Sequence, residues 1–395
     1  MKRLLDIHTW SVARLAVLLI VTATCAPTLL LAREPGERPV LPAEWPQVAL
    51  IEGKGTPAAK AQIPSGTAQA PGMAVPDPRQ LRYDVIHYGL DLQVEATAGW
   101  LSGRVETVFV VTDGPLDQFV LDLRDNMNIS GVAIKAPYQN LATWTRQDDR
   151  VIVNLPTPIA TGTAGMIEVQ YWGQPQVEGL FGYRVETNAA GDPIVATVSE
   201  PWSARSWWPC KDDPNDRAMT TVTIRAPLGM VGVSNGKLTL RSGNTTQWFQ
   251  VNPVPTYLVS IAVGDYVELA DQYDGPAGRI DLRHWVYPGE EDDVREDMSV
   301  LPGMLDFCAS LLGPYPFAGQ PFGIAEVPWD EAMEHPTAVT WGDVLVTGTH
   351  QFDTVLMHEL AHMWFGNLVS PVDWTHIWLN EGFATYFEAL WAEHV

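Results

Sequence analysis

The chain has 395 residues, with 24 lysines and arginines against 47 aspartates and glutamates, so its formal net charge is −23. This charge argues against nucleic acids and anionic membrane surfaces as partners, because both would repel it. The length is sufficient for two domains with a large buried core.

The first 32 residues have the pattern of an export signal. Lys2, Arg3 and Arg14 precede an uncharged run at residues 15–32. This run also reaches the length at which an uncleaved membrane anchor is feasible, so the sequence leaves a cleaved signal and an anchor open. We expect an exported protein, either secreted, periplasmic or held on the outer side of a membrane by this segment alone.

Residues 33–78 predict a flexible linker. The segment is rich in proline, glycine and alanine, and Trp45 is its only aromatic residue. Such a composition provides too little apolar surface for a core. Folded structure is therefore expected from residue 79 onward.

Residues 79–267 predict an all-β domain of sandwich or saddle type. Several runs are rich in β-branched residues and are bounded by glycine, proline, aspartate or asparagine, which is typical of strands. The predicted strands are at residues 105–111, 119–123, 151–155, 167–171, 220–224 and 257–263.

Residues 268–395 predict a second domain that mixes strands and helices, so the fold class is α+β. Strands are expected at residues 280–287 and 339–346, and helical spacing runs from Val294 to Leu312. Pro302 should kink or divide that helix, because proline lacks the N–H that a helix interior requires. Cys210 and Cys308 lie beyond the export segment and could form one disulfide or none.

The strongest chemical signal is a short motif on a predicted helix at residues 354–366. His358 and His362 are four residues apart, so both lie on one helical face and can reach one metal ion. Glu359 lies about 100° further round the helix, where it could act on a metal-bound water. Zinc requires a third protein ligand, and Glu381 on the next helical run is the candidate. The alternative is a pair of satisfied core histidines with an unrelated glutamate.

Residues 358–386 resemble the gluzincin aminopeptidases, the zinc enzymes related to membrane alanyl aminopeptidase and leukotriene epoxide hydrolase. The similarity includes residues 331–335, which stand where the family carries G-x-M-E-N, and residues 200–214, which resemble its segment ending in P-C-x-D-x-P. The motifs follow the family's order from residue 80 to residue 395.

The resemblance implies a β domain followed by a thermolysin-like catalytic domain that is incomplete at its carboxyl end. It also implies an aminopeptidase with one Zn²⁺ per chain, bound by His358, His362 and Glu381. Glu359 would be the general base, taking a proton from the zinc-activated water and passing it to the leaving amine. Ligand type favours zinc without excluding cobalt or manganese.

The resemblance also implies a substrate site for peptides with a free amino terminus. Glu334 and Glu200 would bind the α-ammonium group, and Ala332 and Met333 would contact the substrate. Two carboxylates in a closed pocket are costly unless a cation joins them, which would make the pocket selective. The glutamate at 200 disfavours an epoxide hydrolase, because that branch resembles the family with glutamine there. The alternative for both glutamates is a role unrelated to substrate.

Two further residues are predicted to support the metal ligands. Glu388 follows Glu381 by seven residues, so the two lie on the same helical face. Glu388 could orient a histidine ligand, or it could be a surface glutamate. Asn380 immediately precedes Glu381 in the Asn-Glu-Gly motif and is predicted to have a similar supporting role.

The sequence departs from the family at three places. Glu331 replaces a glycine and His335 replaces an asparagine, which puts the fit of the substrate in question. The family's oxyanion-stabilising tyrosine does not occur between Glu381 and Val395 at the family's spacing, and Tyr386 is not assigned its role. We therefore expect a fragment of a longer aminopeptidase. The alternative is a catalytically weak or inactive zinc-containing protein that binds peptides.

Overall fold

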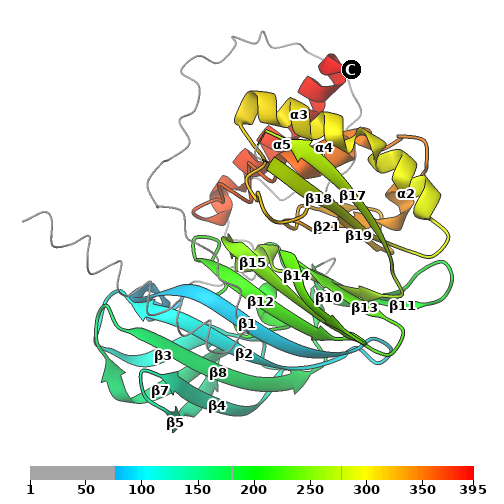
Figure 1. Ribbon diagram of the computed structural model, residues 1–395. Coiled ribbons are helices and arrows are strands. Elements are labelled where there is room, and N and C mark those ends of the chain that lie inside the picture. The colour runs from blue at the N-terminus through cyan, green and yellow to red at the C-terminus, as the bar shows by residue number, and fades with distance from the viewer. Residues whose placement is uncertain (1–75, 179–180, 277) are drawn as a thin grey trace, which may run out of the picture. The chain divides into compact units, whose positions relative to one another are not determined.

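The computed structural model describes residues 76–178, 181–276 and 278–395. The predicted export segment and most of the predicted linker lie outside the described residues. A β-rich amino-terminal region is followed by a region in which helices pack on a smaller sheet (Figure 1), so the predicted α+β class is confirmed. None of the helices in the described part of the chain combines the length and apolar character needed to cross a membrane.

The largest sheet has eight strands and begins after a short 3-10 turn, η1 (Gln80–Arg82). Strand β1 pairs in parallel with β12 and antiparallel with β2. Leu90, Leu92 and Val94 alternate along β1 and are buried, because alternate side chains of a strand face one side of the sheet. The strand order is β14 (Lys237–Ser242), β15 (Thr245–Pro255), β12 (Arg217–Arg225), β1 (Tyr83–Glu95), β2 (Trp100–Val111), β8 (Ala164–Gly173), β4 (Asn128–Ala136) and β5 (Asn140–Leu141).

Two smaller sheets complete the β-rich region. The first has the order β3 (Leu116–Asp122), β7 (Arg150–Ile159) and β6 (Thr143–Gln147). The second has the order β13 (Val231–Ser234), β16 (Ile261–Gly264), β11 (Pro193–Val198), β10 (Phe181–Thr187) and β9 (Val177–Glu178).

The strand predicted at residues 257–263 is partly wrong. The chain forms a 3-10 turn, η3 (Thr256–Leu258), and only then enters β16 at Ile261. All three residues of η3 are buried. The apolar run at residues 257–263 therefore indicated burial correctly. Burial alone does not determine whether the backbone is extended.

A buried polar network surrounds η2 (Ala204–Ser206) in the β-rich region. Arg205 donates from Nε to Asp212 Oδ2 at 2.8 Å, and its Nη1 lies 3.7 Å from Asp122 Oδ1. Gln80 donates to Asp122 at 2.7 Å, and Thr256 donates to Asp212 at 3.1 Å. We call these five residues the Arg205 network.

The last sheet carries the helices. Its order is β17 (Val267–Gly275), β18 (Gly278–Val286), β19 (Ile324–Val327), β21 (Val339–Gly342) and β20 (Ala332–Met333). Helices α3, α4 and α5 pack on one another beside this sheet (Figure 1). The helices and turns are α2 (Glu291–Asp297), η4 (Met298–Val300), α3 (Leu301–Leu312), η5 (Asp343–Leu345), α4 (Asp353–Ala361), η6 (Trp374–His376) and α5 (Ile377–His394).

The structure tests the predictions for Pro302, for the strand at residues 339–346 and for the two cysteines. Pro302 does divide the predicted helix, because α2 ends at Asp297 and α3 starts again with Pro302 in its first turn, where no N–H is needed. The strand predicted at residues 339–346 ends early, at Gly342, and continues as η5. Cys210 and Cys308 are both buried and free, so they form no disulfide with each other.

Candidate functional site

His358 lies on helix α4, and His362 is the residue that caps the carboxyl end of this helix. Leu356, Met357 and Leu360 are buried and fix this helix in the core. His358 and His362 are one turn apart, and their ring centroids are 4.7 Å from each other. Both histidines are buried, so their positions are set by the packing of the helix.

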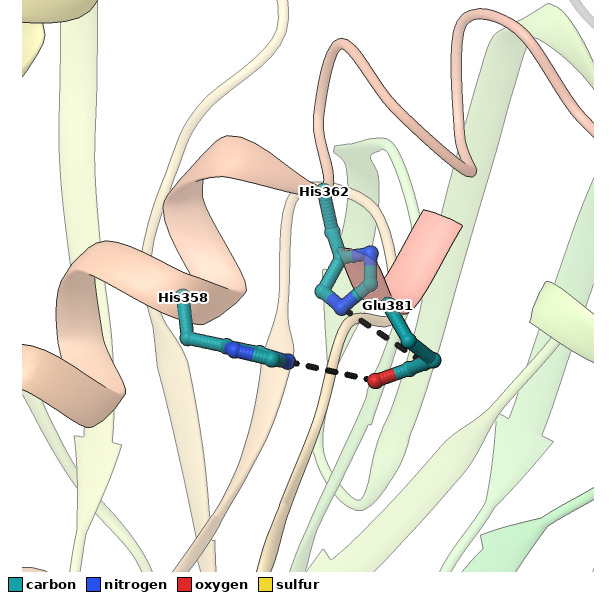
Figure 2. Close-up of side chains that lie close together, drawn as sticks. All are labelled: His358, His362 and Glu381. Carbon is teal, nitrogen blue, oxygen red and sulfur yellow. Dashed lines mark ion pairs between the residues drawn. The ribbon is translucent and has the colours of Figure 1, made fainter. Parts of the chain in front are cut away.

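Glu381, in the first turns of α5, faces both histidines (Figure 2). Its Oε2 lies 3.4 Å from His358 Nε2, and its Oε1 lies 3.8 Å from His362 Nε2. The three ligand atoms lie within 4.8 Å of one another. Zinc bonds of about 2.0–2.2 Å in a tetrahedron place ligand atoms roughly 3.3–3.6 Å apart. The three side chains therefore fit a zinc ion.

The hydrogen bonds of the two Nδ1 atoms orient the histidine rings. His362 Nδ1 lies 2.9 Å from the carbonyl oxygen of Phe365, which can only accept, so this nitrogen carries the proton. His358 Nδ1 lies 2.5 Å from Glu388 Oε1, an acceptor whenever the carboxyl group is ionised. Both rings then direct an Nε2 lone pair toward Glu381, as metal-binding histidines do.

Glu334, Glu359 and His362 form a second close group, again with ligand atoms within 4.8 Å. Glu334 Oε1 lies 3.8 Å from His362 Nδ1, the nitrogen whose proton is bonded to Phe365. That nitrogen has no lone pair for a metal ion. Glu334 and Glu359 are 2% and 1% exposed. Two buried carboxylates this close favour a shared proton or a cation, and an ammonium group has the right charge and donors.

Glu334 directly follows the edge strand β20, whose two residues are Ala332 and Met333. Glu331, which precedes the strand, is exposed. His335 is fully buried, its Nδ1 lies 2.7 Å from Thr340 Oγ1, and burial lowers its pKa to about 3. It is therefore a neutral ring that bonds within its own hairpin.

Glu200 lies in the β-rich region and is half-buried. Its relation to the site is seen at Tyr257, a fully buried tyrosine. The pKa of Tyr257 is raised well above its usual value by burial and then by the carboxylates of Glu334, Glu200 and Glu381. The charges of all three carboxylates therefore act on the hydroxyl group of Tyr257. The sequence analysis gave Tyr257 no role beyond the strand predicted at residues 257–263.

Aromatic rings surround Tyr257. Trp374 packs edge-on against it with ring centroids 4.9 Å apart, and Trp202 packs on Trp374 at 5.8 Å. The hydroxyl of Tyr257 lies 3.5 Å from the carbonyl oxygen of Gly366. These rings extend from the segment that carries Glu200 to the segment that precedes Glu381.

The predicted supporting residues differ in their contacts. Glu388 contacts His358 directly, as described above. Asn380 is buried, and within the described part of the chain it forms no hydrogen bond with His358 or His362, whose Nδ1 atoms bond to Glu388 and Phe365. It lies beside Gly366, where an added Cβ would be 3.4 Å from Asn380 Nδ2 and 3.2 Å from His362 Nδ1. Gly366 has φ of 118°, a region that favours glycine.

The segment that leads into α4 is fixed by Asp297, the last residue of α2. Its carboxylate accepts backbone N–H bonds of 2.7–2.9 Å from Thr347, Gly348, Thr349 and His350. Burial raises the pKa of Asp297, but these four donors outweigh it and the pKa is lowered overall. This anchor, which sequence reasoning missed, holds the start of the histidine helix.

Comparison with known proteins identifies the family. The pattern of the Peptidase M1 N-terminal domain matches residues 84–258, and that of the Peptidase family M1 domain matches residues 316–395. Aminopeptidase M1 of Arabidopsis thaliana is 30% identical over 262 residues, covering 62% of this chain and 29% of that protein. The chain thus spans about a third or less of the length of the first curated relatives it matches.

Solved structures agree in fold and sequence. The M1 zinc metallopeptidase from Deinococcus radiodurans is 30% identical, with a TM-score of 0.66, covering 79% of this chain and 71% of that one. A mutant of that protein bound to a Tyr-Ser-Ala substrate is 29% identical with the same TM-score, covering 79% of this chain and 71% of that one. On the domain patterns, the relatives and the shared fold, the chain belongs to peptidase family M1.

Proposed function

We propose that this chain carries the metal and amine sites of a zinc-dependent aminopeptidase that removes amino-terminal residues from peptides. The observation that supports this most directly is the arrangement of two adjacent groups. Three side chains suited to zinc meet at one point, and two buried carboxylates, Glu334 and Glu359, lie directly beside them. The family's known members include aminopeptidases, which favours this activity.

Zinc held by His358, His362 and Glu381 would act as a Lewis acid on the scissile carbonyl group and on water. Glu359 follows His358 in the helix and is buried, so its carboxylate can take a proton from the attacking water. The same carboxyl group can then return the proton to the leaving amine. The buried position strengthens its interaction with the substrate, because little water is present to compete.

The ammonium group of the substrate would bind between Glu334 and Glu200, which accounts for selectivity toward free amino termini. Strand β20 is the outer strand of its sheet and carries Ala332 and Met333. An extended peptide could pair with the outer edge of β20. This pairing would place the first peptide bond of the substrate near Glu359.

Export remains part of this proposal. It is supported by the basic residues and uncharged run within residues 1–32. Localisation of the full protein, with the segment of residues 1–32 present or deleted, would test it. Retention of the intact protein inside the cell would contradict export.

The direct test of function is hydrolysis of aminoacyl amides by the 395-residue protein, with each substrate offered with a free and with an acetylated amino terminus. We expect cleavage of the free-amine substrates alone, loss of cleavage with a chelator and recovery with added zinc. Equal cleavage of the acetylated substrates would contradict an aminopeptidase. One bound zinc and selective peptide binding without cleavage would support the peptide-binding alternative.

Glu359→Gln is the matched control for this test. It removes the base but keeps the size of the side chain, so we expect turnover to fall by about 10²- to 10⁴-fold. Zinc content, measured by elemental analysis, should stay at the wild-type value because Glu359 is not a metal ligand. Unchanged turnover would contradict the role of Glu359.

A further inference from the structure

The turn that follows the histidine helix folds back on it. The backbone N–H of Asn367 donates to the carbonyl oxygen of His362 at 3.0 Å, and that of Leu368 donates to Met363 at 3.1 Å. Asn367 is fully buried. The turn is therefore bonded to the end of the histidine segment, while α4 itself is held in the core by its buried apolar residues.

The side chain of Asn367 connects this turn to the amine pocket. Its Nδ2 donates to the backbone carbonyl oxygen of Glu334 at 2.7 Å. A single buried residue is thus bonded through its backbone to a predicted metal ligand and through its side chain to the predicted ammonium-binding residue. The distance between His362 and Glu334 depends on this link.

An arginine of the β-rich region holds the same turn from the other side. Arg217, the first residue of β12, donates from Nη1 to Leu368 O at 2.7 Å and from Nη2 to Asn367 O at 2.6 Å. The fixed fork of a guanidinium group sets both carbonyl groups at once. A lysine in its place has a single ammonium group and cannot reproduce this geometry.

The residues after Glu334 are also held by the β-rich region. Asn235 donates from Nδ2 to Pro336 O at 3.0 Å, and the N–H of Gly236 donates to Thr337 Oγ1 at 2.5 Å. Gly236 has φ of 91°, and a Cβ there would lie 2.2 Å from Phe249 O. The segment with Glu334 is therefore fixed by both Asn367 and the loop of Asn235.

We propose that Arg217 and Asn367 are positioning residues that set the separation of His362 and Glu334, so that the β-rich domain takes part in recognising the substrate's amino terminus. This inference rests on the proposed amine pocket. Binding sites of this kind require positions held within roughly 0.5 Å. The bonds from Arg217 to Asn367 and from Asn367 to Glu334 supply that restraint, and Arg217 and Asn367 themselves lie outside the pocket.

The test uses a ligand that cannot be hydrolysed. Binding of L-tryptophan and N-acetyl-L-tryptophan to the zinc-loaded 395-residue protein would be measured by calorimetry, for the wild type and for Arg217→Met. We expect Arg217→Met to weaken L-tryptophan binding at least tenfold, because release of the turn changes the position of Glu334 relative to His362. Zinc content should stay unchanged, because the buried helix α4 still holds the histidines in place. Affinity for the acetylated ligand should not change. Arg217→Lys should be intermediate.

Arg225→Met is the matched control, because Arg225 lies on the same strand but pairs at the surface with Asp91. It should bind both ligands as the wild type does. If Arg217→Met does not fold, Arg217→Lys and Asn367→Leu decide the question by the same measurement. Wild-type affinity for L-tryptophan in these folded variants would overturn the inference, and so would an equal loss of zinc and ligand binding.

The wild type separates this inference from the proposed function. If the wild-type protein does not distinguish L-tryptophan from its acetylated form, the amine pocket itself is wrong and both proposals are overturned. If the wild type does distinguish them and Arg217→Met distinguishes them equally well, only the positioning role is overturned.

Discussion

The protein contains two buried polar clusters that are built in opposite ways. In the Arg205 network, donors and acceptors of the protein satisfy one another, and a guanidinium group lies between Asp122 and Asp212. Burial lowers the pKa of Arg205, but Asp212 and Asp122 outweigh it and raise the pKa overall. At the proposed zinc site, by contrast, the Nε2 lone pairs and the Glu381 oxygens converge on one point.

This difference indicates which cluster serves the fold and which serves function. Charges that are paired within the protein can hold one unique structure without a partner from outside. Acceptors that face one point require a cation from outside, because acceptors cannot bond to one another. Burial of polar residues is common to both clusters, so burial alone does not identify a functional site.

The largest effect on stability should come from breaking the Arg205 network. Arg205→Met would leave Asp212 buried without its guanidinium partner, whereas Asp122 would keep Arg150, whose Nε lies 3.7 Å from its Oδ1. Removal of one partner of a buried ion pair typically costs about 3–5 kcal/mol. We expect a corresponding decrease in the free energy of unfolding, measured with urea. Arg279→Met is the control, because Arg279 and its partner Asp274 are both exposed and such a pair is worth at most about 1 kcal/mol. Similar stability of the two variants would contradict the proposed difference.

His87 is a buried histidine outside both clusters, and its pKa makes the stability of the protein depend on pH. His87 on β1 lies 2.9 Å from Thr221 Oγ1, and burial lowers its pKa from 6.5 to about 4. The unfolded chain binds a proton below about pH 6.5 while the folded chain does not, so stability falls as pH decreases from 6.5 toward 4. The contribution of His87 between pH 7.5 and 5 is about 2 kcal/mol.

His87→Gln should reduce this loss, measured as urea unfolding at both pH values. The same substitution should leave zinc content unchanged, because His87 is remote from the metal site in the sheet. An equal pH dependence in the variant and the wild type would show that His87 does not titrate as its burial predicts.

The smallest expected effect concerns Glu388, which belongs to the metal site but is not a ligand. Glu388→Gln removes the charge that holds His358 Nδ1–H, and such changes typically weaken metal binding about 10- to 100-fold. Competition with a chelator at fixed pH would measure the affinity. Glu393→Gln, at an exposed position of the same helix, is the control and should bind zinc normally. Equal affinities would show that Glu388 does not support the ligand.

The sequence predicted the parts of the site that depend on local geometry. The spacing of His358 and His362 places both on one side of a helix, and the division at Pro302 follows from the missing N–H of proline. The predictions for residues 257–263 and 339–346 were less accurate. Both are short apolar runs, whose pattern indicates burial but does not distinguish a strand from a 3-10 turn.

By itself, the sequence predicted that His358 and His362 lie on one side of a helix with Glu359 beside them, because a helix fixes the distance between residues one turn apart. Only the tertiary structure decided which groups meet across the fold. Glu200 comes near Tyr257, and Arg217 bonds to Asn367, which is 150 residues away in the chain. No local period encodes such contacts, because they depend on how separate sheets and helices pack.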